Sequence, residues 1–312
     1  ARGGGGGSRD DRGVALIVVL LVLAVVGVVG AEFAYSMRLE AGAVRAYKDG
    51  IIAHHLAEAA VAQATREIVA DAPYVTVDER GVLTFYTRER LELPRLPREK
   101  VEFGGGQYSY RISDEEGRIN LNTSAPDRVD RLLRELRLDK GVRDTIVDSL
   151  QDWRDPNEEY RLNGAESDYY LKLPVPYRAK NANLDSVREL LQIRGVTPEI
   201  YAGAPGGPGL ADLVTAKTPG QININTAPPL VLRALGLAEA QVGEIVQARH
   251  VTPYPSVPAT FGGRGLAAQT RTFRIEAEGI VDGRVAARLA AVVQRRDGAP
   301  PSVVILEWSG LR

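Results

Sequence analysis

The first pattern in the chain is an apolar run close to its beginning. Residues 14–31 carry no charged side chain, and these 18 residues suffice for a helix to cross a membrane. Beyond them, apolar residues recur at helical spacing, and the next proline is Pro73. The pattern therefore predicts one helix from Val14 to about Ala70, which at 1.5 Å per residue is about 85 Å long.

The flanks of this apolar run predict its orientation. Residues 1–13 are rich in glycine and charge, and we expect them to be disordered. Arg2, Arg9 and Arg12 precede the run, which favours a cytoplasmic N-terminus with the rest of the chain outside. A cleaved signal peptide and a buried core helix are the alternatives. The helical pattern continues past the apolar run, which argues against a signal peptide.

The remaining sequence alternates between strand-like and helical stretches. Strand-like stretches lie at both ends of the soluble region, and Asp282-Gly283 is a hairpin signal between the last two of them. Residues 298–312 are expected to form a tail with an apolar stretch at Val303–Leu306. The predicted strands are Tyr74–Val77 and Val82–Tyr86 around a Glu-Arg-Gly turn, Gln107–Ile112, Thr272–Gly279 and Val285–Gln294.

An internal repeat lies between these groups of strands. Gly117–Thr123 matches Gly220–Thr226, and each copy is followed by Ala-Pro and a helical pattern. The second copy resembles a helix-hairpin-helix module, and residues 184–196 resemble one more weakly. We therefore expect an α+β fold with a long N-terminal transmembrane helix and an antiparallel sheet. A large, mainly α-helical insertion with helix-hairpin-helix-like elements would interrupt the sheet between about Asp114 and Asp212.

Charge argues against nucleic acid as a ligand. The chain has 39 Lys and Arg against 40 Asp and Glu, for a net charge of −1. The hairpin of the second helix-hairpin-helix-like copy is Gly236–Glu239. It has an acid where a phosphate-binding hairpin would favour another glycine. No nucleic acid is therefore expected, although a membrane-anchored helix-hairpin-helix protein that binds DNA stays open as an alternative.

The acidic segment, residues 152–168, is the richest polar stretch of the chain. Asp155, Asn157 and Glu159 alternate as they do in calcium-binding loops. Asp152, Glu166 and Asp168 could complete the oxygen shell of a Ca²⁺ ion. The alternative is a solvated loop whose acids pair with Arg154 and Arg161, while Trp153, Tyr169 and Tyr170 act as packing anchors.

Nothing in the sequence indicates an enzyme. Cysteine is absent, and His54, His55 and His250 are the three histidines. His54 and His55 lie with Glu58 on the predicted long helix, where a solvent-facing or packing role is expected. The glycine clusters at 203–209 and 262–265 lack the sequence setting of a phosphate loop and are expected to be surface loops.

The beginning of the apolar run resembles that of type IV pilin-like proteins. Gly13 precedes the sequence VALIVVLL, and in that family a prepilin peptidase cuts after this glycine and the new N-terminus is usually methylated. The resemblance implies cleavage between Gly13 and Val14. The fifth mature residue is usually a glutamate whose buried carboxylate pairs with a neighbour's N-terminal amine, but here it is Val18. An apolar residue at this position resembles the K-type minor pseudopilins of type II secretion systems.

This resemblance implies a role and a set of partners. The chain would be a single-pass inner-membrane protein with a periplasmic C-terminal domain. Without a carboxylate at Val18, it would lie at the tip of the pseudopilus and help to initiate it, supporting protein export across the outer membrane. Its partners would be the I- and J-type minor pseudopilins, the major pseudopilin, the inner-membrane assembly platform and the prepilin peptidase. The family also implies calcium in the insertion. A tip subunit of a type IV pilus is a further alternative.

The expected organisation follows from these assignments. The segments are a leader (1–13), the transmembrane part of the helix (14–31), the rest of the pilin-like helix with the first strands (32–113), the helical insertion (114–212), the rest of the pilin-like domain (213–297) and the tail (298–312).

Overall fold

The computed structural model describes residues 10–70, 72–78, 81–298 and 301–311 of the 312. Most of the glycine-rich start that we expected to be disordered, and most of the expected Glu-Arg-Gly turn, lie outside these ranges. The chain divides into two compact units, residues 1–52 and 53–312, which are described separately below.

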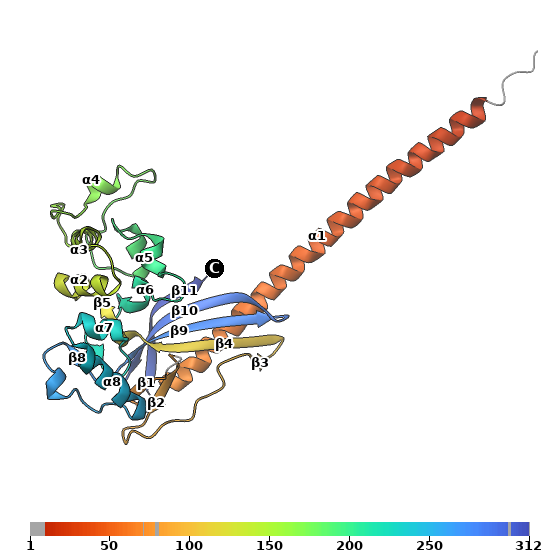
Figure 1. The fold of residues 1–312 in the computed structure, drawn as a ribbon. Coiled ribbons are helices and arrows are strands. Elements are labelled where there is room, and N and C mark those ends of the chain that lie inside the picture. Colours follow the sequence, from red (N-terminus) through yellow and green to blue (C-terminus); the bar gives the residue numbers. More distant parts are fainter. Residues whose placement is uncertain (1–9, 71, 79–80, 299–300, 312) are drawn as a thin grey trace, which may run out of the picture. The chain divides into compact units, whose positions relative to one another are not determined.

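The long helix is present as one continuous element. Helix α1 (Asp10–Ile68) has 59 residues and begins four residues before the expected start (Figure 1). Its stretch from Val14 to Ile68 is long and apolar enough to cross a membrane, with a mean hydropathy of 3.2 in its most apolar part. In the first unit the apolar side chains of this stretch are exposed; Val18, for example, is 52% exposed. This exposure suits a lipid environment, because lipid rather than protein would cover such side chains.

The second unit contains a sheet and a helical region. The bounds of its elements are β1 (Tyr74–Val77), β2 (Leu83–Tyr86), β3 (Val101–Phe103), β4 (Gly106–Asp114), η1 (Glu115–Gly117), β5 (Ile119–Asn120), α2 (Pro126–Glu135), α3 (Lys140–Arg154), α4 (Ser167–Tyr170), η2 (Val187–Gln192), α5 (Pro198–Ala202), α6 (Leu210–Leu213), β6 (Val214–Thr215), β7 (Ile222–Asn223), α7 (Pro229–Ala234), α8 (Glu239–Val251), η3 (Ala259–Phe261), β8 (Leu266–Ala267), β9 (Thr272–Val281), β10 (Arg284–Arg296) and β11 (Ser302–Leu311).

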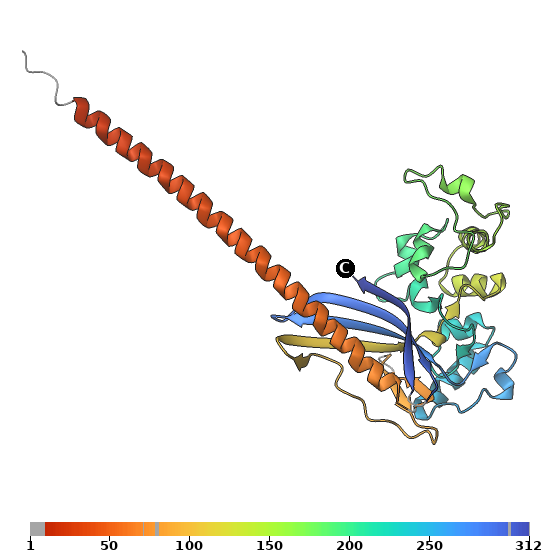
Figure 2. The same ribbon diagram turned by 180° about the vertical axis from the view of Figure 1, so that it is seen from behind.

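The main sheet is antiparallel and has the strand order β11-β10-β9-β4-β3, and β1 and β2 form a separate hairpin. The last part of α1, residues 53–68, packs against one face of the sheet (Figure 2). The buried side of this helix segment is made largely of small residues such as Ala53, Ala57 and Ala60. Small residues let the helix backbone approach the strands closely. The α+β class and the expected strands are therefore confirmed.

The closest approach is made at Gly279 in β9. A Cβ atom built on Gly279 would overlap the backbone of Ala53. We expect Gly279→Ala to lower the free energy of unfolding by about 2 kcal/mol, because helix and strand would have to separate. Gly310→Ala is the control, since the space around Gly310 is open. Urea unfolding followed by circular dichroism measures both, and equal stability of the two variants would refute this explanation.

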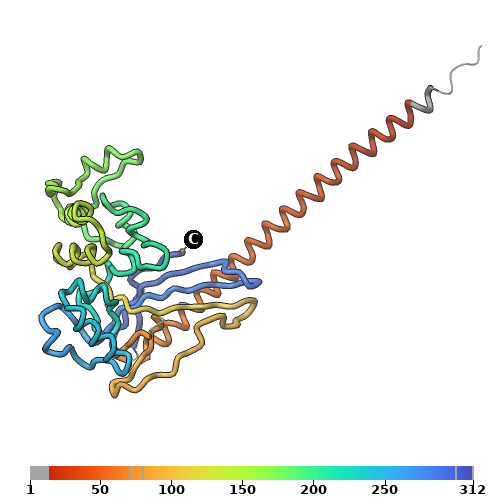
Figure 3. The backbone as a smooth tube through the Cα atoms, viewed as in Figure 1, coloured from red at the N-terminus to blue at the C-terminus, as the bar shows by residue number. Residues whose placement is uncertain are grey.

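The helical region extends farther along the chain than expected. It enters from β4 and returns into β9, and these two strands lie side by side (Figure 3). One hydrophobic core includes residues from Ile119 to Ala268 and crosses the expected boundary at residue 212. The two repeats share this core, in which α2 packs against α7.

The two copies of the repeat have the same local structure. β5 and β7 each form a short parallel pair with a later strand, β6 and β8 respectively. Asn122 donates from Nδ2 to the carbonyls of Leu184 and Ala216, and its Oδ1 accepts from the Leu184 amide. Asn225 makes the equivalent three hydrogen bonds in the second copy. Each asparagine thus closes its repeat by bonding to backbone far along the chain.

Two further segments complete the second unit, and the first of them differs from the expected tail. The tail contains a ten-residue strand, β11, paired with β10 at the edge of the sheet. After β4, η1 is a single 3₁₀ turn capped by Asp114, and Asp114, Glu115 and Glu116 are all buried. The Asp114 carboxylate accepts hydrogen bonds from Asn223, Thr226 and Thr270 of the second repeat and its flank, as well as from the Glu116 amide. These three carboxylates join the sheet to the helical region.

Candidate functional site

The acidic segment runs from the last turn of α3 into the first residues of α4 (Figure 1). Aromatic side chains fix this loop from beneath. The Trp153 and Tyr170 rings are 5.4 Å apart, and Tyr170 stacks on Tyr177 at 5.1 Å. Trp153 and Tyr170 are buried, whereas Tyr169 is partly buried and lies 5.2 Å from Tyr170. All three expected packing anchors therefore support the loop.

Asp152 and Asp155 share one cation. Asp152 is fully buried, and its Oδ1 accepts from Nη1 of Arg161 at 2.6 Å, as does Oδ2 of Asp155 at 2.6 Å. The Arg161 amide also donates to Asp152 at 3.1 Å. A Cβ on Gly164 would overlap Oδ2 of Asp152, so the loop backbone closes tightly around this carboxylate. Arg161 pairs as the solvated-loop alternative expected.

The other cation of that alternative, Arg154, is used differently. Its Nη1 donates to the Leu121 carbonyl and its Nη2 to the Gln151 amide oxygen, and no acid in the described part of the segment forms an ion pair with it. The loop is therefore not neutralised in the way that the solvated-loop alternative requires.

Glu166 is the unusual group of the site. It is 1% exposed, and neither of its carboxylate oxygens has a hydrogen-bond partner among the described residues. Burial, followed by the negative charges of Asp152, Asp155 and Glu158, raises the pKa of Glu166 to about 7. An unpartnered buried carboxylate beside three other acids is a costly arrangement unless a proton or a cation compensates the charge.

The other expected calcium ligands either bond within the loop or face solvent. Asn157 uses its Oδ1 to accept from the Glu159 amide at 2.7 Å, so their alternation produces a local turn. Glu159 is exposed, and Asp168 pairs with Lys172 at 3.5 Å on the exposed side of α4. Within the described ranges, no three histidine or acidic side chains are arranged to hold a metal ion.

Sequence reasoning missed Glu158. Its carboxylate accepts from the amide and hydroxyl of Ser167 and from Nδ2 of Asn181, which places it beside Glu166. The alternating pattern favoured Asn157 and Glu159 and passed over the residue between them. Its membership of the acidic segment was the signal for it in the sequence.

The charged side chains of the helix-hairpin-helix elements form ion pairs within the protein. Arg233 of α7 donates to Glu135 of α2 and pairs with Glu239 of α8. The Ala238 amide, directly before α8, donates to the side-chain oxygen of Gln241. A phosphate-binding hairpin would need free cations and free amides at this place. In this part of the chain both are engaged by internal partners.

The expected processing site lies in the first unit. Val14 and Val18 are exposed positions of α1, and the backbone of Gly13 lies in the same helix. Cleavage after Gly13 and methylation of the new N-terminus stay predictions. Outside this segment, His55 contacts Glu58 at 2.8 Å on the exposed surface of α1, as expected for a solvent-facing pair.

Two family models match the chain, and both describe protein K of the type II secretion system. They cover residues 111–204 and 222–274, which together span the acidic segment and the second repeat. The chain is 26% identical to the putative type II secretion system protein K of Escherichia coli K12 over 62% of this chain and 61% of that protein. It is 26% identical to the protein of that name from Aeromonas hydrophila over 75% of each chain.

Other comparisons cover less of the relative or show the fold alone. Type II secretion system protein K of Pectobacterium carotovorum is 31% identical over 34% of its own length. This chain thus spans about a third of the Pectobacterium relative and six tenths of the Escherichia coli relative. A chain in the crystal structure of the GspK-GspI-GspJ complex from enterotoxigenic Escherichia coli has a similar fold. The TM-score is 0.58 at 20% identity, and the match covers 70% of this chain and 84% of that one.

Proposed function

Because this chain belongs to the type II secretion system protein K family, we propose that it is a minor pseudopilin at the tip of the secretion pseudopilus. The observation that carries the proposal is the continuity of α1. One helix begins with an exposed apolar stretch and ends packed against the sheet of the second unit. Such a helix serves both as a membrane anchor and as part of a folded domain.

Val18 supports the place at the tip. A carboxylate at this position would be costly in the bilayer unless it paired with the terminal amine of a neighbour. The valine removes that pairing, so the subunit does not need a neighbour on the side of the pseudopilus tip. In this proposal the peptidase cuts after Gly13, the N-terminus is cytoplasmic before export, and the second unit is periplasmic. The subunit would thereby support protein export across the outer membrane.

The proposed partners are the I- and J-type minor pseudopilins. Support comes from the relative of similar fold, which was solved in a complex of GspK, GspI and GspJ. The major pseudopilin, the assembly platform and the prepilin peptidase complete the set expected for such a subunit. The relatives are named for type II secretion, which favours a secretion pseudopilus over a type IV pilus.

We also propose that the acidic segment holds a calcium ion. Glu166 would supply the unpartnered oxygens, and Asp152 and Glu158 are the acids beside it. Carbonyl oxygens of the loop would complete the shell, since Ca²⁺ accepts mixed oxygen ligands. The ion would supply the positive charge that the buried carboxylate of Glu166 lacks. Its role would be structural, holding the loop from Asp155 to Ala165 against α3 and α4.

Membrane extraction and purification test the proposed function. We expect the full chain, expressed with its own secretion genes and solubilised in detergent, to copurify with the I- and J-type pseudopilins and to begin at Val14. A mature N-terminus elsewhere, or a chain that fractionates without membrane, would contradict the proposal. Salt-dependent binding of the purified chain to DNA would instead favour the helix-hairpin-helix alternative.

A further inference from the structure

Strand β11 forms a long edge of the main sheet. It pairs with β10 on one side, and within residues 301–311 no backbone group on the other side is bonded to another described segment. The opposite edge strand, β3, has only three residues. Long edges are usually protected by proline, lysine or a covering segment, and Ser302–Leu311 contains neither residue. The free edge of β11 is therefore able to accept another strand.

The exposed apolar side chains of β11 indicate which residues an added strand should carry on one face. Ile305 lies opposite Val293 and Trp308 opposite Ala291 in β10. Paired residues share a face, and both β10 residues are buried at 1% exposure. Ile305 and Trp308 are nevertheless 55% and 44% exposed, because the sheet ends beside them. An added strand with apolar side chains on this face would cover both.

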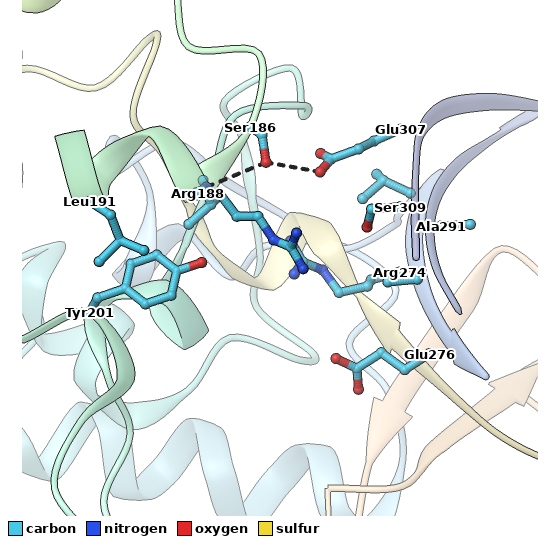
Figure 4. A pocket seen from close by; sticks show the side chains of 12 residues that line it. Ser186, Arg188, Leu191, Tyr201, Arg274, Glu276, Ala291, Glu307 and Ser309 are labelled. Carbon is cyan, nitrogen blue, oxygen red and sulfur yellow. Dashed lines mark hydrogen bonds between the residues drawn. The ribbon is translucent and has the colours of Figure 1, made fainter. Parts of the chain in front are cut away.

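The other face of β11 borders a cavity. This cavity of about 460 Å³ lies between β9–β11 and the helical region, with Glu307 and Ser309 of β11 in its wall (Figure 4). Glu307 accepts from the Ser186 hydroxyl at 2.9 Å, and Arg274 is held by Glu115 at 2.7 Å. The Arg188 side chain extends toward Arg274, and in the described part of the chain its guanidinium has no ion-pair partner.

The cavity wall holds two cations, Arg188 and Arg274, and two acids, Glu276 and Glu307; Arg274 pairs with Glu115, which leaves Arg188 as the cation that could bind an added carboxylate. Arg188 comes from η2 in the helical wall of the cavity, whereas Arg274 and Glu276 come from β9 (Figure 4). A carboxylate that entered beside β11 would meet a guanidinium that is free to bind it. The strand added at the edge would thus carry apolar residues on one face and an acid on the other.

We propose that the outer edge of β11 is the docking site for an extended segment of a partner pseudopilin. The segment adds a strand to the sheet, covers Ile305 and Trp308, and places an acidic side chain next to Arg188. The inference rests on the proposed function, because it takes the partner from there and names the surface that binds it. Backbone hydrogen bonds supply affinity in this mode, and the two faces supply specificity.

The test uses the full chain in detergent, with the I- and J-type pseudopilins of the same secretion system as probes. We expect Ile305→Lys to weaken binding about tenfold and Arg188→Gln about fivefold, because one places a charge at the edge and the other removes the carboxylate partner. Leu162→Lys and Arg137→Gln are matched controls at exposed positions elsewhere in the helical region, and their binding should change less than about twofold.

Amide hydrogen exchange identifies the mode of binding. On addition of the partners, exchange should slow in residues 302–311, which helix-to-helix contacts alone would not cause. If the partners bind but this exchange and the two variants are unaffected, the docking site is refuted and the proposed function stands. If neither partner binds the unchanged chain, both are refuted. Slowed exchange in a dimer of this chain without partners would overturn the choice of occupant.

Discussion

In calcium-free buffer, the full chain in detergent should lose stability as the pH rises from about 5 to 8, and Glu166→Gln should remove most of that loss. The folded state raises the pKa of Glu166 to about 7, whereas the unfolded value is near 4.3. A raised pKa means that the protonated carboxyl contributes stability below the unfolded pKa. That contribution amounts to about 4 kcal/mol in full, and it is lost as the pH rises from the unfolded pKa through 7.

Calcium should reverse this trend. The ion binds the charged carboxylate, so at pH 7.5 and above it should raise the melting temperature of the unchanged chain. A free concentration of 100 times the dissociation constant gives about 2.7 kcal/mol. Glu166→Gln keeps the size of the side chain but offers one neutral oxygen, so its response to calcium should be small. Thermal unfolding by circular dichroism, with EGTA or CaCl₂ at each pH, measures both effects.

The control for this experiment is Asp168→Asn. Asp168 was a candidate ligand on spacing, but its side chain is 63% exposed and pairs with Lys172. Its substitution should leave both the pH dependence and the calcium response unchanged. If EGTA and CaCl₂ give the same melting temperature above pH 7, the calcium proposal is wrong. A pH dependence that persists in Glu166→Gln would show that another group is responsible.

Patterns of local spacing predicted the elements well. The helix from Val14, the β9–β10 hairpin and the two copies of the repeat each depend on periodicity or on residues that are close in sequence. Only the ends were shifted, as when α1 begins at Asp10. The strand in the tail was harder to predict, because β11 depends on pairing with β10 and its burial pattern is irregular at the bulge near Val292.

Contacts between distant segments could not be predicted in the same way. The expected boundary at residue 212 rests on the strand-like sequence after it, whereas the shared core of α2 and α7 continues beyond it. At the candidate site, the alternation of Asp155, Asn157 and Glu159 indicated a loop rich in oxygen ligands. Which carboxylate is left without a partner depends on Arg161 and Ser167, whose hydrogen bonds are set by the folded loop.

Asn225→Leu should be one of the most destabilising single substitutions in the second unit. Asn225 is fully buried; its Nδ2 donates to the carbonyls of Tyr254 and Ala268 at 3.0 and 2.9 Å, and its Oδ1 accepts from the Tyr254 amide at 2.7 Å. Leucine has a similar size but leaves three backbone groups without partners. At about 1–3 kcal/mol for each buried group, we expect a loss of about 4 kcal/mol in the free energy of unfolding.

The repeat provides an internal comparison for this prediction. Asn122 makes the same three bonds but is only partly buried, so water can replace some of them and Asn122→Leu should cost about half as much. Asn183→Leu, at an exposed position, should have little effect. Urea unfolding of the three variants gives the order. If Asn122→Leu proved as costly as Asn225→Leu, burial would not determine the cost, and the asparagines would act through the shape of the turn in which each lies.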